Sequence, residues 1–528
     1  MSASGAHPRS RTRLYWAPIL AIGAMLIGVY GVAGGLPAIS ALTTLRVPGQ
    51  YPTIQSAINA APTGAIIAIG PGTYPEQLTI DKTLSLTGSG VGRTIIQSPT
   101  VLRSDAFGAL WTIEAGGGAV VTLSGITVMV TLQCLATPTT AEYSQAGYAG
   151  GGIGVGGGAT LNLVSSAITT ASSLEGGSCL PPPPATSGRM SYGTGISFGL
   201  DVARGGAPVS ALVGSGTVTG VTISGFGFDG PSIAVGGWVD SPSGSHAVLS
   251  NDHVLMTTDP VSPRPPIGIA VGAGGNASVA TVSNSFVSGG VGTSSVLLFG
   301  ASAGTTLSVS HTSLIGTGSG NAISIQHGAV ATITGNQIHP GTGAGAFGIE
   351  VEQGFATIVG NSILGPTGGE GIWMFQSSAV IQGNTIGLFE CSFYPGFQGL
   401  CGPHSTQIAA NGIFDGLDAG HGTTITNNVI YSTDEAIYLY GGCPGCAVDQ
   451  NTIQNSVYYG LVGEDGVFSF GPNVVIGGMY GVAAVAFSVD TLVNVDAEVF
   501  GGQSVGPWYA EVDFPGGTAG VVGPGITT

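Results

Sequence analysis

Apolar and small polar residues alternate along the chain in short runs, and these runs recur at a regular interval. Successive blocks start 23 to 27 residues apart, with one longer interval of 41 residues. Each block has an apolar start, a glycine turn and an alternating Thr/Val/Ile segment, which is the period-two pattern of a β-strand. The blocks begin at Ile269, Val296, Ile323, Ile349, Ile372, Ile413, Ile437 and Leu461, with weaker copies at Ile233, Ile196, Ile153 and Trp111.

An asparagine recurs near the end of many blocks, two residues before an apolar residue. Asparagine tolerates the left-handed backbone conformation, which predicts that it occupies a sharp corner. Asparagines stacked in register can also hydrogen-bond through their amides from one repeat to the next. The recurring residues are Asn336, Asn361, Asn384, Asn428 and Asn451.

A repeat of about 24 residues with three short strands is typical of one coil of a parallel β-helix. A single coil cannot bury its apolar face alone, so the stacking of neighbours supplies the core. The repeat therefore predicts one all-β solenoid, where length alone would suggest two to four domains.

The region after residue 46 adds a family resemblance. The segments Val47–Ile58, Gly70–Glu76 and Leu84–Gly88 are similar to the opening of the pectin-lyase-like right-handed β-helix superfamily. The resemblance covers about residues 46–500 and implies a single-stranded right-handed parallel β-helix. It also implies a short amphipathic helix over about Thr53 to Ala61 that caps the open end, and the apolar spacing there fits such a helix.

Composition and charge exclude several classes. Glycine supplies 94 of 528 residues and charged residues only 7%, against about 25% in typical domains. Low charge with 43% hydrophobic residues excludes a disordered chain, and the lack of a three-residue glycine period excludes collagen. All ten Lys and Arg lie at or before Arg264, so the half from Pro265 onward has 16 acidic residues and no cation. A nucleic-acid partner is excluded, because it would require clustered Lys or Arg.

The N-terminal segment predicts export. Arg9, Arg11 and Arg13 precede a charge-free run that reaches Leu45. Residues 1–41 are therefore a signal peptide, with a cleavage site near Ala38–Ser40, or an uncleaved membrane anchor. Both alternatives place the rest of the chain outside the cytoplasm or at the cell surface, with no other membrane contact. The glycine-rich residues 501–528 are interpreted as a C-terminal tail.

Six cysteines fit an exported protein with disulfides. The most local pairing joins Cys134 to Cys179, Cys391 to Cys401 and Cys443 to Cys446. The Cys-x-x-Cys spacing of the last pair also leaves open a redox site or half of a zinc site.

The repeat predicts a strip of outward side chains on the first strand of successive coils. If each block-starting residue points inward, the next residue points outward. The outward residues in earlier coils are small, whereas acidic and aromatic residues gather in later ones. Flat rings suit the apolar faces of sugars, and the family resemblance implies a sugar cleft on this face, so we expect polysaccharide binding here. Three alternatives stay open: an aromatic core covered by the insertion at about 387–410, a ladder that stiffens the sheet, and a protein contact. The predicted strip is Glu350, Glu352, Trp373, Phe375, Phe414, Tyr438 and Tyr440.

Catalytic residues are less clearly indicated. The esterase motifs of the superfamily are absent, its lyases typically use an Arg or Lys base, and the Asp415, Asp418 and Gly420–Gly422 constellation is too compressed for a polygalacturonase. An enzyme of this kind would therefore be a glycoside hydrolase. Glu370 and Glu435 occupy equivalent positions two coils apart, at roughly 9.6 Å, near the upper limit for inverting glycosidases. Solvated or calcium-bound carboxylates are the alternative, and no other cofactor is indicated.

Two functional hypotheses follow from these observations. The first is an exported protein that binds, and as a hydrolase cleaves, an extracellular polysaccharide, with neutral glycans favoured because the strip has no cation. The second is a non-enzymatic structural or adhesive protein of the cell surface. The sequence predicts no oligomeric state.

Overall fold

The computed structural model describes residues 43–99, 111–130, 148–149, 151–170, 191–192, 194–199, 213–226, 231–236, 244–256, 267–273, 277–341, 346–364, 370–387, 411–416, 422–433, 435–443, 445–496 and 498–523. For residues 411–416 this description covers the backbone alone. The predicted export segment, Cys134, Cys179, Cys391, Cys401 and the insertion from 388 to 410 lie outside the described residues. In the described part of the chain, no helix is long and apolar enough to cross a membrane.

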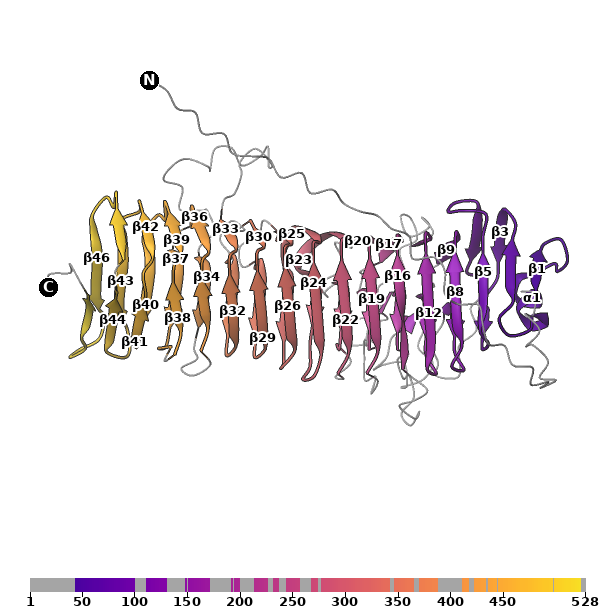
Figure 1. Cartoon of the computed structure of the whole chain (residues 1–528), viewed down its shortest axis with the longest axis horizontal. Helices are drawn as coiled ribbons and strands as arrows, with labels where there is room; N and C mark the ends of the chain where they lie inside the picture. Colours follow the sequence, from indigo (N-terminus) through magenta and orange to yellow (C-terminus); the bar gives the residue numbers. More distant parts are fainter. Residues whose placement is uncertain are drawn as a thin grey trace, which may run out of the picture. The chain divides into compact units, whose positions relative to one another are not determined.

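The described strands form three rows, and each turn of the chain adds one strand to a row (Figure 1). The first row comprises β4 (Leu78–Ile80), β7 (Trp111–Ala115), β11 (Gly151–Val155), β15 (Ile196–Phe198), β18 (Pro231–Val235), β21 (Ile267–Val271), β23 (Phe286–Gly300), β25 (Ser313–Gln326), β28 (Ile349–Glu352), β31 (Ile372–Phe375), β34 (Asn411–Gly416), β37 (Glu435–Tyr440), β40 (Tyr459–Glu464), β43 (Tyr480–Ala486) and β46 (Gly506–Val512). The second row comprises β1 (Thr44–Val47), β2 (Ile66–Ile69), β5 (Leu84–Thr87), β8 (Val120–Ser124), β12 (Ala159–Val164), β16 (Gly214–Thr219), β19 (His246–Ser250), β22 (Val279–Ser283), β24 (Thr306–Ser310), β26 (Val330–Thr334), β29 (Phe355–Val359), β32 (Ser378–Gln382), β35 (Thr424–Thr426), β38 (Ala447–Asp449), β41 (Val467–Phe470), β44 (Thr491–Val495) and β47 (Ala519–Val522).

The third row shares two strands with the first. It comprises β3 (Gly72–Pro75), β6 (Thr94–Gln97), β9 (Thr127–Val130), β13 (Ala167–Thr170), β17 (Thr222–Phe226), β20 (His253–Met256), β27 (Gln337–His339), β30 (Ser362–Ile363), β33 (Thr385–Gly387), β36 (Val429–Tyr431), β39 (Thr452–Gln454), β42 (Val474–Ile476) and β45 (Val499–Gly501). The long strands β23 and β25 belong to both rows and join them. A separate short pair, β10 (Tyr148–Ala149) and β14 (Ser191–Tyr192), completes the described strands. All of these pairings are parallel, which confirms the predicted all-β parallel solenoid.

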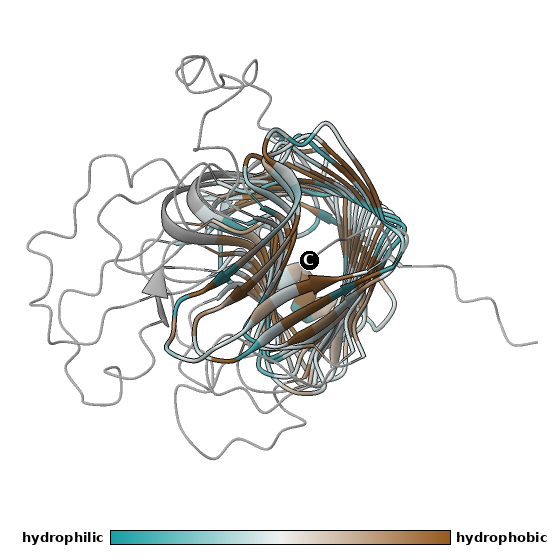
Figure 2. Cartoon of the chain, turned by 90° about the vertical axis from the view of Figure 1, so that its left-hand side faces the viewer, coloured by the Kyte–Doolittle hydropathy of each residue, from teal (hydrophilic) through white to brown (hydrophobic). Residues whose placement is uncertain are grey.

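Inward side chains of the three rows fill one continuous apolar core. Figure 2 shows the strand rows that surround this core end-on. The block-starting residues Ile349, Ile372, Ile437 and Leu461 are fully buried, as the alternation predicted. Burial of each such side chain stabilises the fold by about 1.5–3 kcal/mol. Because each coil contacts the next through such residues, the stack is the unit that forms a stable core.

A helix lies beside the first coils, within the range that the sequence predicted. Helix α1 (Ile54–Ala60) begins after Thr53, whose side chain and that of Ser56 form a capping box, and it contacts β1, β2 and β4. The Glu76 carboxylate accepts hydrogen bonds from the backbone N–H groups of Ile54 and Gln55, both at 2.9 Å. Carboxylates stabilise a helix N-terminus, which gives the Gly72–Glu76 element a structural role.

The recurring asparagines form a buried ladder along the stack, and they hydrogen-bond from coil to coil as predicted. Each Nδ2 donates to Oδ1 of the next member at 2.9–3.0 Å. Each backbone N–H also donates to that same Oδ1 atom. The asparagine ladder consists of Asn336, Asn361, Asn384, Asn428, Asn451 and also Asn473, which the sequence pattern missed because Val475 replaces the usual Ile.

The conformational reason given for these asparagines was wrong. The left-handed conformation belongs to the residue before each of the first five ladder positions, for example Gly335 (φ 63°), Asn427 (φ 56°) and Gln450 (φ 57°). The ladder asparagine itself is selected by its hydrogen bonds, since its amide can both donate and accept along the stack.

Two inward positions and the end of the coils also differ from the predicted ones. Leu298, and not Val296, pairs with Ile269 and Ile323, because β23 contains register shifts between Gly289 and Val296. In β7 the inward residue is Ile113, so the outward partner of Gly154 is Glu114 and not Thr112. The coils also continue beyond residue 501, because β46 and β47 pair with β43 and β44.

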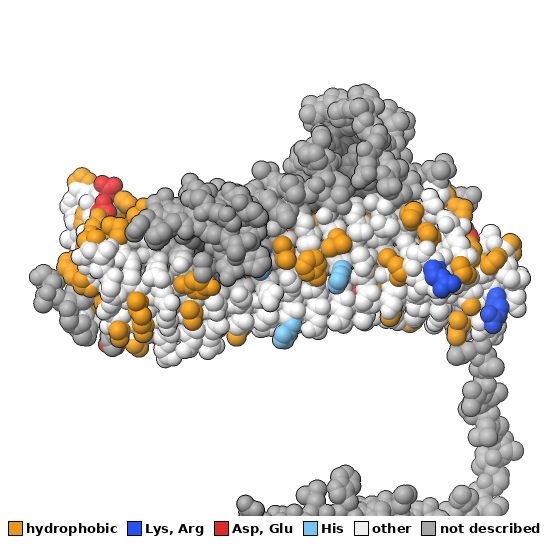
Figure 3. All heavy atoms as spheres, turned by 90° about the horizontal axis from the view of Figure 1, so that it is seen from above, with side chains coloured by type: hydrophobic (Ala, Val, Ile, Leu, Met, Phe, Trp, Pro, Cys, Tyr) orange, Lys and Arg blue, Asp and Glu red, His pale blue; other side chains and the backbone are white. Residues whose placement is uncertain are grey.

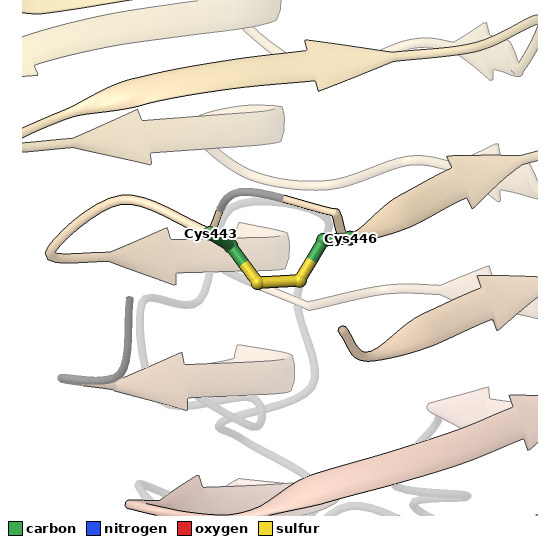
Figure 4. The surroundings of a disulfide bond; sticks show 2 residues. All are labelled: Cys443 and Cys446. Carbon is green, nitrogen blue, oxygen red and sulfur yellow. A yellow bond between two sulfur atoms is a disulfide. The ribbon is translucent and has the colours of Figure 1, made fainter. Parts of the chain in front are cut away.

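The predicted pairing of Cys443 with Cys446 lies in a turn between β37 and β38, and Figure 4 draws their sulfur atoms joined. Their Cα atoms are 5.4 Å apart, inside the range of about 4.4–6.8 Å that disulfides span. In the described part of the chain, no group of three or more His, Cys, Asp or Glu is placed to hold a metal ion.

Candidate functional site

The outer face of the first row changes character along the stack. In the earlier coils the outward residues are small and buried, as with Ser197, Ala234 and Ala270 at 0–1% exposure. Trp111 contributes to this burial by lying against Gly151 and Gly154, where a Cβ atom would collide with its ring. In β28, β31 and β37 the outward side chains are partly exposed. Partly exposed acidic and aromatic side chains lie next to each other on this face at β28 and β31.

The register at this position is the predicted one. Glu350 pairs with Trp373, Trp373 with Phe414, and Phe414 with Tyr438. In the same pair of strands, β28 and β31, Glu352 pairs with Phe375. The side chain of Phe414 lies outside the described residues, so its place in the strip rests on its backbone alone. The roles of these residues in substrate binding stay predictions.

Three aromatic rings form a flat stack on this part of the face. The rings of Phe347 and Trp373 have centroids 5.1 Å apart and an interplanar angle of 6°. Those of Trp373 and Phe375 are 5.8 Å apart at 11°. We call these three residues the aromatic stack. Phe347 was missed from the sequence, because it lies two residues before the inward Ile349, on an outer position that we considered only for acids.

Glu350 is in register with Trp373 of the aromatic stack on one side and with Ser324 of β25 on the other. Its Oε2 atom accepts hydrogen bonds from Asn321 Nδ2 at 2.9 Å, from Ser324 Oγ, and from Gln326 Nε2 at 3.4 Å. The same Asn321 accepts the backbone N–H of Phe347 through Oδ1, at 2.9 Å. β25 thus positions the acid and one end of the aromatic stack together.

Burial raises the pKa of Glu350, the hydrogen bonds from Ser324 and Asn321 oppose this shift, and the nearby charge of Glu352 adds to it. Two carboxyl groups therefore share an environment that is partly withdrawn from water. Desolvated carboxylates favour a proton or a positively charged partner.

The proposed acids Glu370 and Glu435 lie on a neighbouring outer row, together with Asn411. Asn411 pairs with Glu435, and Glu370 stands two residues before Ile372 as Asn411 does before Ile413. Burial raises the pKa of Glu370 to about 7. A carboxyl with such a pKa keeps its proton in mildly acidic solution, which is what a general acid requires.

Tyrosines gather further along the same face. Tyr459, Tyr480 and Tyr509 have ring centroids 5.0 to 5.8 Å apart. Two of them, Tyr459 and Tyr509, lie together with Tyr438 against a small cluster of buried outward residues, which comprises Val462, Ala483 and Val485. This tyrosine cluster is a small apolar core on the outside of the sheet, which supports the covered-core alternative for Tyr438. The partly exposed aromatic stack remains the better candidate for a binding surface.

Charge is distributed unevenly along the stack. Among the described residues the cations are Arg46, Lys82 and Arg93, all in the first coils. On the face seen in Figure 3, Lys and Arg appear only toward the end that carries α1, and acidic side chains gather at the opposite end. The aromatic stack belongs to the half of the chain that contains no Lys or Arg.

Comparisons with known proteins agree with the fold. Residues 268–493 match the family model of the right-handed β-helix region. None of the curated proteins compared with the chain matches it. Among solved structures, an alginate lyase from Paenibacillus sp. is similar at 12% identity and a TM-score of 0.31, over 65% of this chain and 94% of the lyase.

Two further solved structures show the same range of similarity. A tailspike protein of an Escherichia coli O157:H7 bacteriophage has 13% identity and a TM-score of 0.37, over 73% of this chain and 43% of the tailspike. An α-1,3-glucanase catalytic unit from Streptomyces thermodiastaticus has 13% identity and a TM-score of 0.33, over 90% of this chain and 70% of that unit. Such values carry no argument about function. The strand rows and the family match together show that this chain has the fold of a right-handed parallel β-helix.

Proposed function

We propose that this protein binds an extracellular polysaccharide through the aromatic stack, with Glu350 and Glu352 as polar contacts. The observation that carries the proposal is the near-parallel, partly exposed arrangement of Phe347, Trp373 and Phe375. The rings stack on one another, and the parts of their surfaces that the stacking leaves uncovered offer an apolar surface to the C–H face of sugar rings. The adjacent carboxylates accept hydrogen bonds from hydroxyl groups. The coil spacing of about 4.8 Å lets successive coils contact neighbouring parts of one chain.

Trp373→Ala is expected to weaken glycan binding at least tenfold, because it removes the central ring of the stack and the surface it shares with both neighbours. Binding is measured by isothermal titration with the oligosaccharides that a glycan array selects for the full chain. The matched control is Phe355→Ala, an exposed aromatic residue of β29 in the second row. Equal affinity of the two variants, or no glycan bound by the unmodified protein, would contradict the proposal and favour the structural or adhesive alternative.

We also infer that the bound glycan is hydrolysed, with Glu370 as the general acid and Glu435 as the general base. The raised pKa of Glu370 supports this assignment, and the two-coil separation of roughly 9.6 Å leaves room for a water molecule. The acid would protonate the glycosidic oxygen while the base takes a proton from the attacking water, which inverts the anomeric configuration.

Glu370→Gln is expected to reduce sugar release about 100-fold at pH 5 without weakening glycan binding, since glutamine keeps the shape but supplies no proton. In the unmodified protein, release should decline as the pH rises through about 7 and Glu370 loses its proton. Reducing-end assays on the variant, on Glu435→Gln and on the exposed-carboxyl control Asp513→Asn measure both effects. Undiminished release by Glu370→Gln and Glu435→Gln would reject this pair.

A further inference from the structure

Acidic side chains flank the aromatic stack, and the Lys and Arg residues in the described part of the chain all lie in the first coils. Glu350 and Glu352 lie on the preceding coil, in register with Trp373 and Phe375, and Glu370 lies two residues before Ile372. No Lys or Arg occurs anywhere from Pro265 to the end of the sequence. The donors that reach Glu350 in the described structure are the neutral side chains of Asn321, Ser324 and Gln326.

The hydrogen bonds of Glu350 are concentrated on one atom. All three donors meet Oε2, so in the described part of the chain the acceptor capacity of Oε1 is left for a ligand. Glu350 and Glu352 are also partly buried, so water solvates their charge incompletely. A positively charged group would compensate both carboxylates more strongly than a hydroxyl group, because charge-assisted hydrogen bonds are about twice as strong as neutral ones.

The rings favour the same kind of ligand. The face of an aromatic ring carries negative electrostatic potential and attracts ammonium groups within about 6 Å. In the aromatic stack this contact is open to the parts of the ring faces that the neighbouring rings leave uncovered. A polyuronate would instead bring carboxylates toward Glu350, Glu352 and Glu370 with no cation to separate them. A neutral glycan would bury part of these acids without compensating their charge.

We propose that the aromatic stack and its flanking acids select a cationic amino glycan, a polymer of hexosamine with free ammonium groups. This inference rests on the proposed glycan-binding function and specifies its substrate class. Each ammonium group would be attracted by the negative potential of a ring face and would donate a hydrogen bond to Glu350 or Glu352. The sugar ring itself would lie on the stack.

Three oligosaccharides with the same β-1,4 linkage test the charge directly. They are hexamers of glucosamine, N-acetylglucosamine and glucose, titrated at pH 6 against the full chain. The glucosamine hexamer is expected to bind at least tenfold more tightly than the other two. This preference should disappear in 1 M salt, where the Debye length is about 3 Å. It should also fall at least threefold in Glu350→Gln and Glu352→Gln but persist in Asp513→Asn, which removes an exposed charge elsewhere.

The outcomes separate this inference from the proposed function. Equal or tighter binding of the glucose or N-acetylglucosamine hexamer would overturn the charge selection and leave the glycan site in place. Tighter binding of oligogalacturonate in the presence of Ca²⁺ would also overturn it, in favour of a calcium-bridged uronate. A failure of every glycan to bind would reject the proposed function itself. Thermal unfolding of each glutamine variant shows whether lost binding reflects lost folding.

Discussion

Asn384→Ala is expected to reduce the free energy of unfolding by about 3–5 kcal/mol, because it interrupts the asparagine ladder at a fully enclosed position. Oδ1 of Asn384 accepts the backbone N–H and the Nδ2 group of Asn361, at 2.9 and 3.0 Å. Its own Nδ2 donates to the Ile358 carbonyl and to Asn428 Oδ1, at 2.9 and 3.0 Å. Alanine removes the acceptor of the buried Asn361 backbone N–H and one hydrogen bond each from Asn361 Nδ2, the Ile358 carbonyl and Asn428 Oδ1. A buried group left without its partner costs about 1–3 kcal/mol.

The measurement is the urea midpoint and the thermal midpoint of the full chain, followed by circular dichroism. Gln382→Ala is the matched control, because Gln382 is exposed and two residues away, and surface changes of this kind usually stay within about 0.5 kcal/mol. Asn384→Asp keeps both acceptors but lacks the two donors, so we expect a similar loss at pH 8. Midpoints for Asn384→Ala equal to those of the control would show that the ladder contributes little to stability.

Stability is expected to fall as the pH rises from about 4 to about 8, the reverse of the usual behaviour of carboxylates. Burial raises the pKa of Asp252 to about 7, against the effect of hydrogen bonds from the backbone N–H groups of Val221 and Ser250. Burial likewise raises the pKa values of Glu370, Glu464 and Glu498 to about 7. In each case the folded state binds the proton more tightly than the unfolded state, so the stabilisation is complete below the unfolded pKa and is lost as the pH rises through the folded pKa.

Asp465 has the opposite effect on the pH dependence of stability, and it lowers the stability at acidic pH. Burial raises its pKa, but hydrogen bonds from Ser488, Val489 and Phe487 outweigh this and lower it overall. Its stabilisation is present above the unfolded pKa and is lost as the pH falls through the lowered value. Maximal stability is therefore expected in mildly acidic solution.

Asp252→Asn isolates the largest single contribution, since Asp252 is fully buried. Its raised pKa corresponds to on the order of 3 kcal/mol between pH 4 and pH 8, and asparagine cannot ionise. The quantity compared is the difference between the unfolding free energies at the two pH values within each protein, so any overall destabilisation cancels. An unchanged difference in the variant, or a stability that increases toward pH 8 in the unmodified protein, would refute the assignment.

Regular repetition made most of the fold predictable. The inward position of Ile349 and Ile372 and the amide contacts of Asn361 and Asn428 follow from a period that places equivalent residues one above another. Prediction failed where the period itself changes. The register shifts in β23 moved the inward residue to Leu298, and no local pattern marks that shift.

The register of the residues in the candidate site could be predicted from the sequence, but which of the aromatic rings contact one another could not. The pairing of Glu350 with Trp373 follows from alternation, whereas the division of the strip into two aromatic groups depends on tertiary packing. Tyr438 lies over Val462 because the outward residues of the next coils are apolar, and Phe347 joins Trp373 from a neighbouring row. Ring contacts across rows require coordinates, since spacing along the chain gives only the row in which each residue lies.

The asparagine ladder also gives the stack an electrical polarity. Every Oδ1 atom accepts a backbone N–H of the preceding coil. Each Nδ2 group of the first five asparagines donates one hydrogen to the Oδ1 atom of the following coil and the other to a carbonyl of the preceding coil. Six amide dipoles therefore align head to tail, and the row ends where Asn473 Nδ2 donates to the Glu498 carboxylate at 3.4 Å. Reversal of one amide would place like atoms against each other at both neighbours. The asparagine amides of the six coils thus share one orientation, and we expect these coils to unfold together and not one by one.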